Sequence, residues 1–193
     1  MKHSGYLILS LLLLASCSAD KEYSEWPCRF EYDNSIHLDA TLAAAQDAAS
    51  RGVFCLITES TKGGNKYLTF LNSNEQTTQQ VETYEEAQKQ FILGINNGII
   101  VGYQTLNEEG PYNGYIAYDV QCPNCVRNEN NTVNPNYRVK MSGNGIAICS
   151  KCGRKYDMNN GGIILNVNEG DSVLEKYVAS TLGPNNWVSV RRR

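Results

Sequence analysis

Histidine is nearly absent from this sequence, and its scarcity limits the chemistry that the chain can perform. The 193 residues include two histidines, His3 and His37. The short motifs of common hydrolases and nucleotide-binding enzymes are missing too: there is no G-x-S-x-G elbow, no phosphate-binding loop and no H-E-x-x-H pair. We therefore expect that the protein is not an enzyme, while a redox role stays open.

An excess of positive charge is missing as well. Lysine and arginine together number 17 against 20 for aspartate and glutamate, which gives a formal net charge of −3 at pH 7. The one basic run, Arg191 to Arg193, ends the chain and is typical of a solvated tail. Because a nucleic-acid partner needs a basic patch or stripe, we expect none here.

Long apolar runs are limited to one, near the N-terminus. Residues Tyr6 to Ala15 follow the basic pair Lys2 and His3, and they are too few to span a membrane as a stable helix. A short basic leader followed by an apolar segment of this length is typical of a signal peptide. We assign residues 1–16 to the signal peptide and residues 17–25 to a polar tether.

The end of this leader, Leu14-Ala15-Ser16-Cys17, resembles the lipobox of bacterial lipoproteins. The resemblance implies that Cys17 is acylated and becomes the first residue of the mature protein, so that the folded body stays at a membrane. Asp20, Lys21 and Glu22 resemble the export signal that sends some lipoproteins of the Bacteroidota to the outer face of the outer membrane, although a hydrophilic spacer explains them equally. We expect an outer-membrane lipoprotein of the cell envelope, either periplasmic or surface-exposed.

Four of the seven cysteines form two closely spaced pairs. Cys122-Pro-Asn-Cys125 and Cys149-Ser-Lys-Cys152 each place two residues between the thiols, and residues 126–148 separate the pairs. Two such knuckles can bring four thiolates around one ion, and sulfur ligands suit zinc, a single iron or an iron–sulfur cluster. The spacing therefore predicts a metal site. The alternatives are two local disulfides or four reduced structural thiols.

Cys28 and Cys55 remain once Cys17 is assigned to the lipid and four cysteines are assigned to the knuckles. An exported protein can oxidise such a pair, and the two cysteines lie on segments that we expect to be adjacent early elements. They are therefore candidates for a disulfide. The alternative is that Cys55, inside the apolar run from Val53 to Ile57, is a small buried hydrophobic residue.

The sequence predicts a mainly β fold with two short helices. Asp39 caps the first of these helices, and Thr83 with Glu86 forms a capping box for the second. The C-terminal half contains short strands between glycine and asparagine turns, without a helical period. We expect an antiparallel β-sandwich or small barrel over residues 26–193, with a metal-binding subdomain over about 112–162.

The second knuckle continues as Cys149-x-x-Cys152-Gly153-x-x-Tyr156-Asp157, and Leu174-x-x-Tyr177-x-Ala179 follows after a glycine turn. This pattern resembles the second cluster-binding motif of Rieske iron–sulfur proteins, C-x-x-H-G-x-x-F/Y-D with its closing strand. The first motif of that family is C-x-H, and its counterpart here is Cys122-x-x-Cys125. Both cluster histidines would thus be replaced, by Cys125 and Cys152. The resulting loops are similar to the paired knuckles of rubredoxins and zinc ribbons.

The resemblance implies a Rieske-like β domain whose centre has a different chemistry. In a Rieske centre two imidazoles hold one of the irons and raise the reduction potential, which four thiolates cannot reproduce. Two knuckles of equal length are the arrangement expected around one ion, so we rank zinc first, an all-cysteine [2Fe-2S] cluster second and a mononuclear iron third. The sequence thus predicts a membrane-anchored, metal-binding lipoprotein with a binding or structural role. The alternative is an iron-containing electron-transfer protein.

Overall fold

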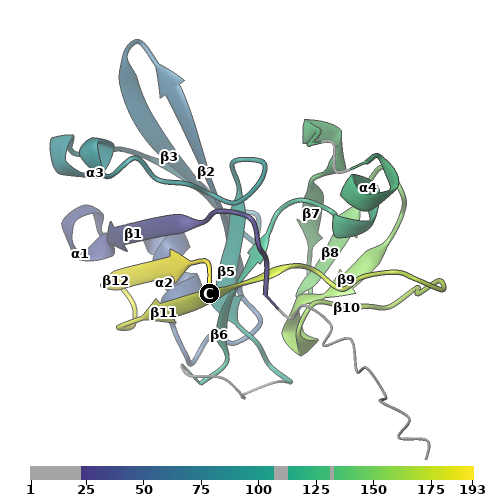
Figure 1. Ribbon diagram of the computed structural model, residues 1–193. Coiled ribbons are helices and arrows are strands. Elements are labelled where there is room, and N and C mark those ends of the chain that lie inside the picture. Colours follow the sequence, from purple (N-terminus) through teal and green to yellow (C-terminus); the bar gives the residue numbers. More distant parts are fainter. Residues whose placement is uncertain (1–22, 107–112, 131–132) are drawn as a thin grey trace, which may run out of the picture.

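Antiparallel strands make up most of the fold and form two sheets (Figure 1). The computed structural model describes residues 23–106, 113–130 and 133–193. All neighbouring strands within the two sheets run antiparallel in this part of the chain. The mainly β, sandwich-like or barrel-like fold that the sequence predicts is confirmed. The expected signal peptide and Cys17 lie outside the described residues.

The larger sheet contains eight strands in the order β1-β12-β11-β6-β5-β2-β3-β4. Its strands are β1 (Arg29–Asp33), β2 (Phe54–Lys62), β3 (Asn65–Asn72), β4 (Thr77–Val81), β5 (Ile99–Tyr103), β6 (Tyr115–Asp119), β11 (Lys176–Thr181) and β12 (Trp187–Arg191). The sheet curls into a half-barrel. Its curvature brings side chains from distant strands, among them Phe30, Phe70 and Val190, into one buried hydrophobic cluster. Burial of this inner face provides the main driving force for folding of the large sheet.

The hairpin between β2 and β3 illustrates how the sequence sets the register. Lys62 pairs with Asn65, so the turn consists of Gly63 and Gly64 alone. Their φ values of 59° and 83° are both positive, as a two-residue hairpin turn of the preferred twist requires. The two glycines therefore supply the backbone conformation that the turn needs.

In the described ranges, four short helices accompany the strands: α1 (Asn34–His37), α2 (Ala40–Gln46), α3 (Tyr84–Lys89) and α4 (Pro123–Asn128). The two helices that the sequence predicts are α2 and α3. Asp39 accepts from the Leu42 N–H at the start of α2, and both hydrogen bonds of the Thr83–Glu86 capping box are present in α3. Helices α1 and α4 were not anticipated, since single helical turns carry no periodic signal. No helix of the described ranges is long and apolar enough to cross a membrane.

The smaller sheet has the strand order β10-β9-β8-β7 and lies beside the half-barrel in Figure 1. Its strands are β7 (Val139–Ser142), β8 (Ile146–Cys149), β9 (Lys155–Asp157) and β10 (Ile163–Ile164). The 3-10 turn η1 (Pro135–Tyr137) precedes β7, and the 3-10 turn η2 (Met158–Asn160) lies between β9 and β10. Its buried cluster combines apolar side chains with three of the knuckle cysteines, Cys122, Cys125 and Cys149. The cysteines are therefore part of the core of this sheet rather than an addition to its surface.

Cys28 and Cys55, the candidates for a disulfide, are free, buried thiols in the structure. The assumption that they lie on adjacent elements is wrong: β12, β11, β6 and β5 separate β1, which follows Cys28, from β2, which contains Cys55. Burial raises the pKa of Cys28 to about 12 and also raises the pKa of Cys55. Both side chains therefore act as small, uncharged members of the half-barrel core.

Candidate metal centre

The first knuckle forms where the chain leaves β6 and the large sheet. Cys122 is the N-cap residue of α4, and Pro123 occupies the start of the helix, where a missing N–H costs nothing. The Cys122 backbone N–H donates to the Tyr137 carbonyl at 2.8 Å, which ties the knuckle to the segment before β7. The backbone N–H of Cys125 donates to the Cys122 sulfur, an interaction that favours the thiolate form.

The second knuckle follows β8, which ends at Cys149. The Gly153 N–H donates to the Cys149 carbonyl at 2.8 Å, and the Cys149 N–H donates to the Arg154 carbonyl at 3.0 Å. Gly153 has a φ of 72°, a conformation that favours glycine. The backbone N–H groups of Lys151 and Cys152 donate to the Cys149 sulfur. In both knuckles, therefore, amide groups point at the sulfur of the first cysteine.

The two knuckles bring four sulfurs together, as the spacing predicts. The Sγ atoms of Cys122, Cys125, Cys149 and Cys152 all lie within 4.8 Å of one another. The Sγ–Sγ distance is 3.7 Å between Cys122 and Cys152 and 3.6 Å between Cys125 and Cys149, so these two short pairs each join one knuckle to the other. All four cysteines are free thiols, which contradicts the alternative of local disulfides. Such a group can hold a metal ion.

The ionisation of Cys122, Cys125 and Cys149 is interdependent. Hydrogen bonding from Cys122 lowers the pKa of Cys149, while the same contact raises the pKa of Cys122. Burial raises the pKa of Cys125 to about 12. Among these three cysteines, protein groups alone therefore favour the thiolate form at Cys149. A bound cation reverses this balance, because its charge stabilises every thiolate that coordinates it.

Tyr156 on β9 supports the centre from the side of the first knuckle. Its Oη lies 3.0 Å from the Cys122 sulfur and accepts a hydrogen bond from Asn124 Nδ2 at 2.9 Å. Because Asn124 fills the acceptor role of this hydroxyl, the tyrosine proton is free to point at the sulfur. Asn124 is itself held by Ser172, whose carbonyl accepts from its Nδ2 at 2.8 Å and whose N–H donates to its Oδ1 at 2.8 Å.

Arg154 supports the opposite side of the centre. Its guanidinium donates to Asp171 Oδ1 at 2.6 Å and also interacts with the Cys152 sulfur, and these two contacts raise the pKa of Arg154. Cys152 is the ligand candidate that is most accessible to solvent, since the other three are buried. The positive charge of Arg154 therefore lies beside Cys152, the least buried of the four sulfurs.

A buried carboxylate connects the first knuckle to the half-barrel. Asp119, the last residue of β6, is 1% exposed. It accepts from Tyr177 Oη at 2.6 Å, from the Ile95 N–H at 2.9 Å and from the Gln121 N–H at 2.7 Å. The last of these bonds fixes the residue immediately before Cys122. Asp119 thus positions the knuckle although it does not touch the sulfurs.

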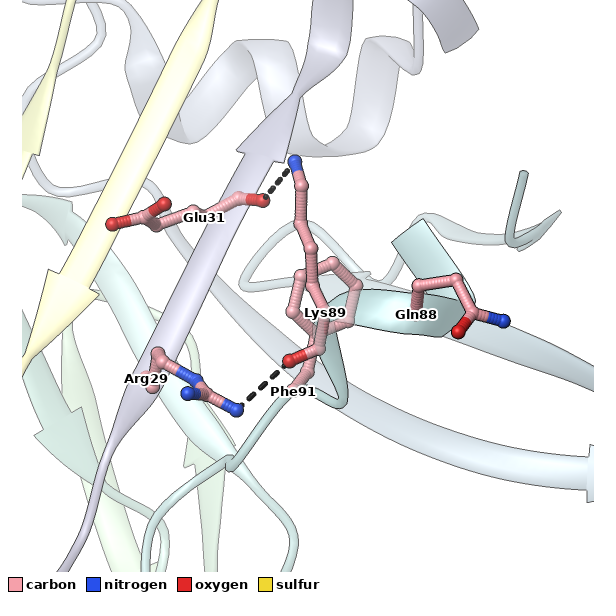
Figure 2. A pocket seen from close by; sticks show the side chains of 5 residues that line it. All are labelled: Arg29, Glu31, Gln88, Lys89 and Phe91. Carbon is pink, nitrogen blue, oxygen red and sulfur yellow. Dashed lines mark hydrogen bonds between the residues drawn. The ribbon is translucent and has the colours of Figure 1, made fainter. Parts of the chain in front are cut away.

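One surface hollow outside the centre, of about 330 Å³, is lined by Arg29, Glu31, Gln88, Lys89 and Phe91 (Figure 2). Its two cations are bound to backbone carbonyls: Arg29 donates to Lys89 O at 2.9 Å, and Lys89 Nζ donates to Glu31 O at 3.3 Å. These bonds attach the end of α3 to β1. The residues of this hollow therefore have a structural role.

His37 lies outside the centre as well. Its Nε2 contacts both carboxylate oxygens of Glu86, at 3.1 and 3.0 Å, and its ring stacks on Tyr32. The histidine therefore joins α1 to α3. It takes no part in the cysteine cluster.

The sequence identified the four sulfur ligands but missed the groups that surround them. Asn124, Asp119 and Asp171 give no local signal, because each acts on a residue that is distant in the chain or through a backbone group. Tyr156 belongs to the motif quoted above, yet its bond to Cys122 could not be inferred from spacing. Comparison of the chain with protein-family models, curated proteins and solved structures finds no match.

Proposed function

We propose that the protein is a lipoprotein of the cell envelope whose four-cysteine centre holds one zinc ion as a structural element. The observation that carries this proposal is the compact group of four sulfurs within 4.8 Å. The ion would join β6 and α4 on one side to β8 and β9 on the other. The alternative is a mononuclear iron or a [2Fe-2S] cluster with an electron-transfer role.

The sulfur geometry supports a single ion. A tetrahedral site with zinc–sulfur bonds of about 2.3 Å has an edge of about 3.8 Å. The two shortest Sγ–Sγ distances, 3.7 and 3.6 Å, lie close to that edge. In a [2Fe-2S] cluster, thiolates on opposite irons lie more than about 5 Å apart, because the two metals extend the site. The upper limit of 4.8 Å for all pairs therefore favours one metal over two.

The surroundings support a structural role. Four protein ligands leave a tetrahedral ion no open position for substrate or water, which is the difference between structural and catalytic zinc sites. Three of the cysteines belong to the buried core of the small sheet. The amide N–H groups and Tyr156 orient the sulfurs and stabilise their negative charge, as groups around metal ligands commonly do.

The same features support the interpretation of the centre as a four-cysteine variant of a Rieske-like domain. The two knuckles lie next to a small antiparallel sheet, and Tyr156 of the second motif contacts a cysteine of the first. Neither histidine of the chain is available to the centre, because His37 contacts Glu86 and His3 belongs to the leader. We therefore infer that the centre lacks the high potential that imidazole ligands give to a Rieske cluster.

Metal analysis of the protein purified from its own host tests this proposal. We expect one zinc per chain and no visible absorption band, because zinc has a filled d shell. A coloured protein with one iron per chain, or with two irons and acid-labile sulfide, would establish the electron-transfer alternative. Protein without stoichiometric metal would refute the metal centre altogether.

Membrane anchoring is tested at Cys17. Replacing Cys17 with serine removes the only thiol that the lipobox offers for acylation, so we expect the protein to move from the detergent phase to the aqueous phase on phase separation. Cys28→Ala serves as the matched control and should leave the partition unchanged. If the Cys17→Ser protein remains acylated and in the detergent phase, the lipoprotein proposal is wrong.

A further inference from the structure

Two carboxyl groups meet in the half-barrel, outside the metal centre. Glu59 belongs to β2, and Glu82 directly follows β4. Both strands pair with β3, so the two side chains approach each other from its two sides. The Glu82 backbone N–H donates to the Lys66 carbonyl at 3.0 Å, which continues the pairing of β4 with β3. Glu82 is 9% exposed, which is unusual for a glutamate without a cationic partner.

The oxygens of this pair are closed to solvent and have no donor. Among the described residues, no N–H or O–H reaches either carboxylate oxygen of Glu82 or the Oε2 atom of Glu59. The two carboxyl groups instead contact each other within hydrogen-bonding reach. Two ionised carboxylates cannot share such a contact, because both are acceptors and both are negative. One proton between them supplies the missing donor and removes the repulsion.

The two members of the pair are not equivalent. Lys66 on β3 contacts Glu59, with 2.9 Å between Lys66 Nζ and Glu59 Oε1. The negative charge is therefore more favourable on Glu59, and the proton is more favourable on Glu82. Burial, followed by the charge of Glu59, raises the pKa of Glu82 from its ordinary value of 4.5 to about 7, against the opposing effect of Lys66.

The ionisable groups on the neighbouring elements do not replace the proton. Glu86 on α3 adds negative charge near Glu82, and its own carboxylate is engaged by His37 Nε2 of α1 at 3.0 Å. Asp39, which precedes α2, accepts from a side-chain amide of β4 at 2.7 Å. Burial raises the pKa of Tyr32 on β1, so its hydroxyl is uncharged. The surroundings of Glu82, apart from Lys66, are therefore neutral or acidic.

We propose that Glu82 is protonated in the folded protein and donates this proton to Glu59, so that the pair forms an acid-favoured latch between β2 and the connection from β4 to α3. When the pH rises, the proton passes to water and two carboxylates are left facing each other. The segment after β4 then gives way, because β4 ends the described sheet and has β3 as its one neighbouring strand. Glu59 is held in place, since its N–H and carbonyl both bond to the Asn97 side chain.

Helix α3 is the element that responds. Glu82 directly precedes Thr83, the N-cap residue of α3, so loss of the latch loosens the start of this helix. Between pH 4.5 and 7 the folded state binds more protons than the unfolded state, and the contribution of the latch is lost as the pH rises through the upper value. The inference depends neither on the metal nor on acylation of Cys17.

Carbon NMR of the metal-loaded protein, labelled at the glutamate carboxyl groups alone, tests the shared proton directly. We expect one glutamate to titrate near pH 7, and its signal to be absent in the Glu82→Gln protein. In Glu59→Gln, the new amide donates to Glu82 and the charge of Glu59 is gone, so the Glu82 midpoint should move toward its ordinary value. If every glutamate titrates near 4.5, or if Glu59→Gln leaves the midpoint unchanged, the proposal is wrong. A midpoint that falls when calcium or magnesium is added would also overturn it, because the pair would then hold a cation.

Hydrogen exchange of the α3 amides tests the latch. After correction for the intrinsic exchange rate, their protection should fall several-fold between about pH 6 and about pH 8 in the unaltered protein. Glu82→Gln should abolish this change, because its amide donates to Glu59 at both pH values. The matched control is Glu85→Gln, which removes the same charge from an exposed residue of α3 and should keep the pH dependence. If Glu82→Gln keeps it too, another group is the source and the latch is refuted.

Discussion

Replacing Cys149 with serine is expected to abolish stoichiometric metal binding and to unfold the small sheet. A serine hydroxyl stays protonated at neutral pH and is a poor ligand for a soft-ligand site, so three thiolates would remain around the ion. The free energy of metal binding is largely folding free energy, about 10–16 kcal/mol for structural zinc in small domains. We expect the variant to lose more than about 3 kcal/mol of its free energy of unfolding, a small part of that range.

The matched control is Cys55→Ala. Cys55 is fully buried like Cys149, but it lies in the half-barrel core and away from the metal centre. This substitution should retain the full metal content and cost about 1 kcal/mol, the typical effect of a small core truncation.

Metal analysis and hydrogen exchange over β7, β8 and β9 measure the two effects. Chelation of the metal from the unaltered protein should reproduce the loss of protection in these strands, while β2, β3 and β5 stay protected. If Cys149→Ser retains one metal per chain, or if its small sheet exchanges as slowly as that of the Cys55→Ala protein, the centre does not stabilise the fold as proposed.

The parts of the fold that were predictable are those with local causes. Two adjacent glycines define the turn between β2 and β3, and a capping box needs only Thr83 and Glu86. The knuckles are equally local, since two residues between cysteines already determine that both thiols can face one ion. Each of these patterns encodes a backbone geometry within a few residues.

The features that could not be predicted depend on chain segments that meet only after folding. The strand order inserts β12, β11, β6 and β5 between β1 and β2, so the neighbours of Cys28 and Cys55 could not be inferred from sequence. Helix α4 is a single short helix whose start is set by Pro123 and by the knuckle itself. The partners of the metal centre come from long range: Tyr156 reaches Cys122 across the small sheet, and Asn124 reaches Ser172.

The pH dependence of stability should report the buried carboxylate at the end of β6. Burial raises the pKa of Asp119 from its ordinary value of 3.8 to about 6, against the opposing effect of its three hydrogen-bond donors. Between these two values the folded state binds more protons than the unfolded state, so the contribution of this group to stability falls as the pH rises through that window. The stability difference between the unaltered protein and an Asp119→Ala variant should therefore be smaller at about pH 7 than at about pH 5.

Asp119→Ala is expected to destabilise the protein by about 3–5 kcal/mol and to loosen the first knuckle. The substitution leaves three buried donors without an acceptor, from Tyr177, Ile95 and Gln121, and each unsatisfied donor costs about 1–3 kcal/mol. Because Gln121 directly precedes Cys122, we also expect faster metal transfer to a competing chelator. Chemical unfolding and the rate of chelator-induced metal loss measure the two effects.

Tyr177→Phe distinguishes the positioning role from a general loss of stability. It removes only one of the three donors, and the two bonds from Asp119 to the backbone N–H groups of Ile95 and Gln121 can remain. We expect a cost of about 1–2 kcal/mol, with metal release close to that of the unaltered protein. If both variants release metal equally fast at matched stability, the bond to Gln121 does not position the knuckle. If Asp119→Ala instead costs less than Tyr177→Phe, the carboxylate contributes little to the connection between the two sheets.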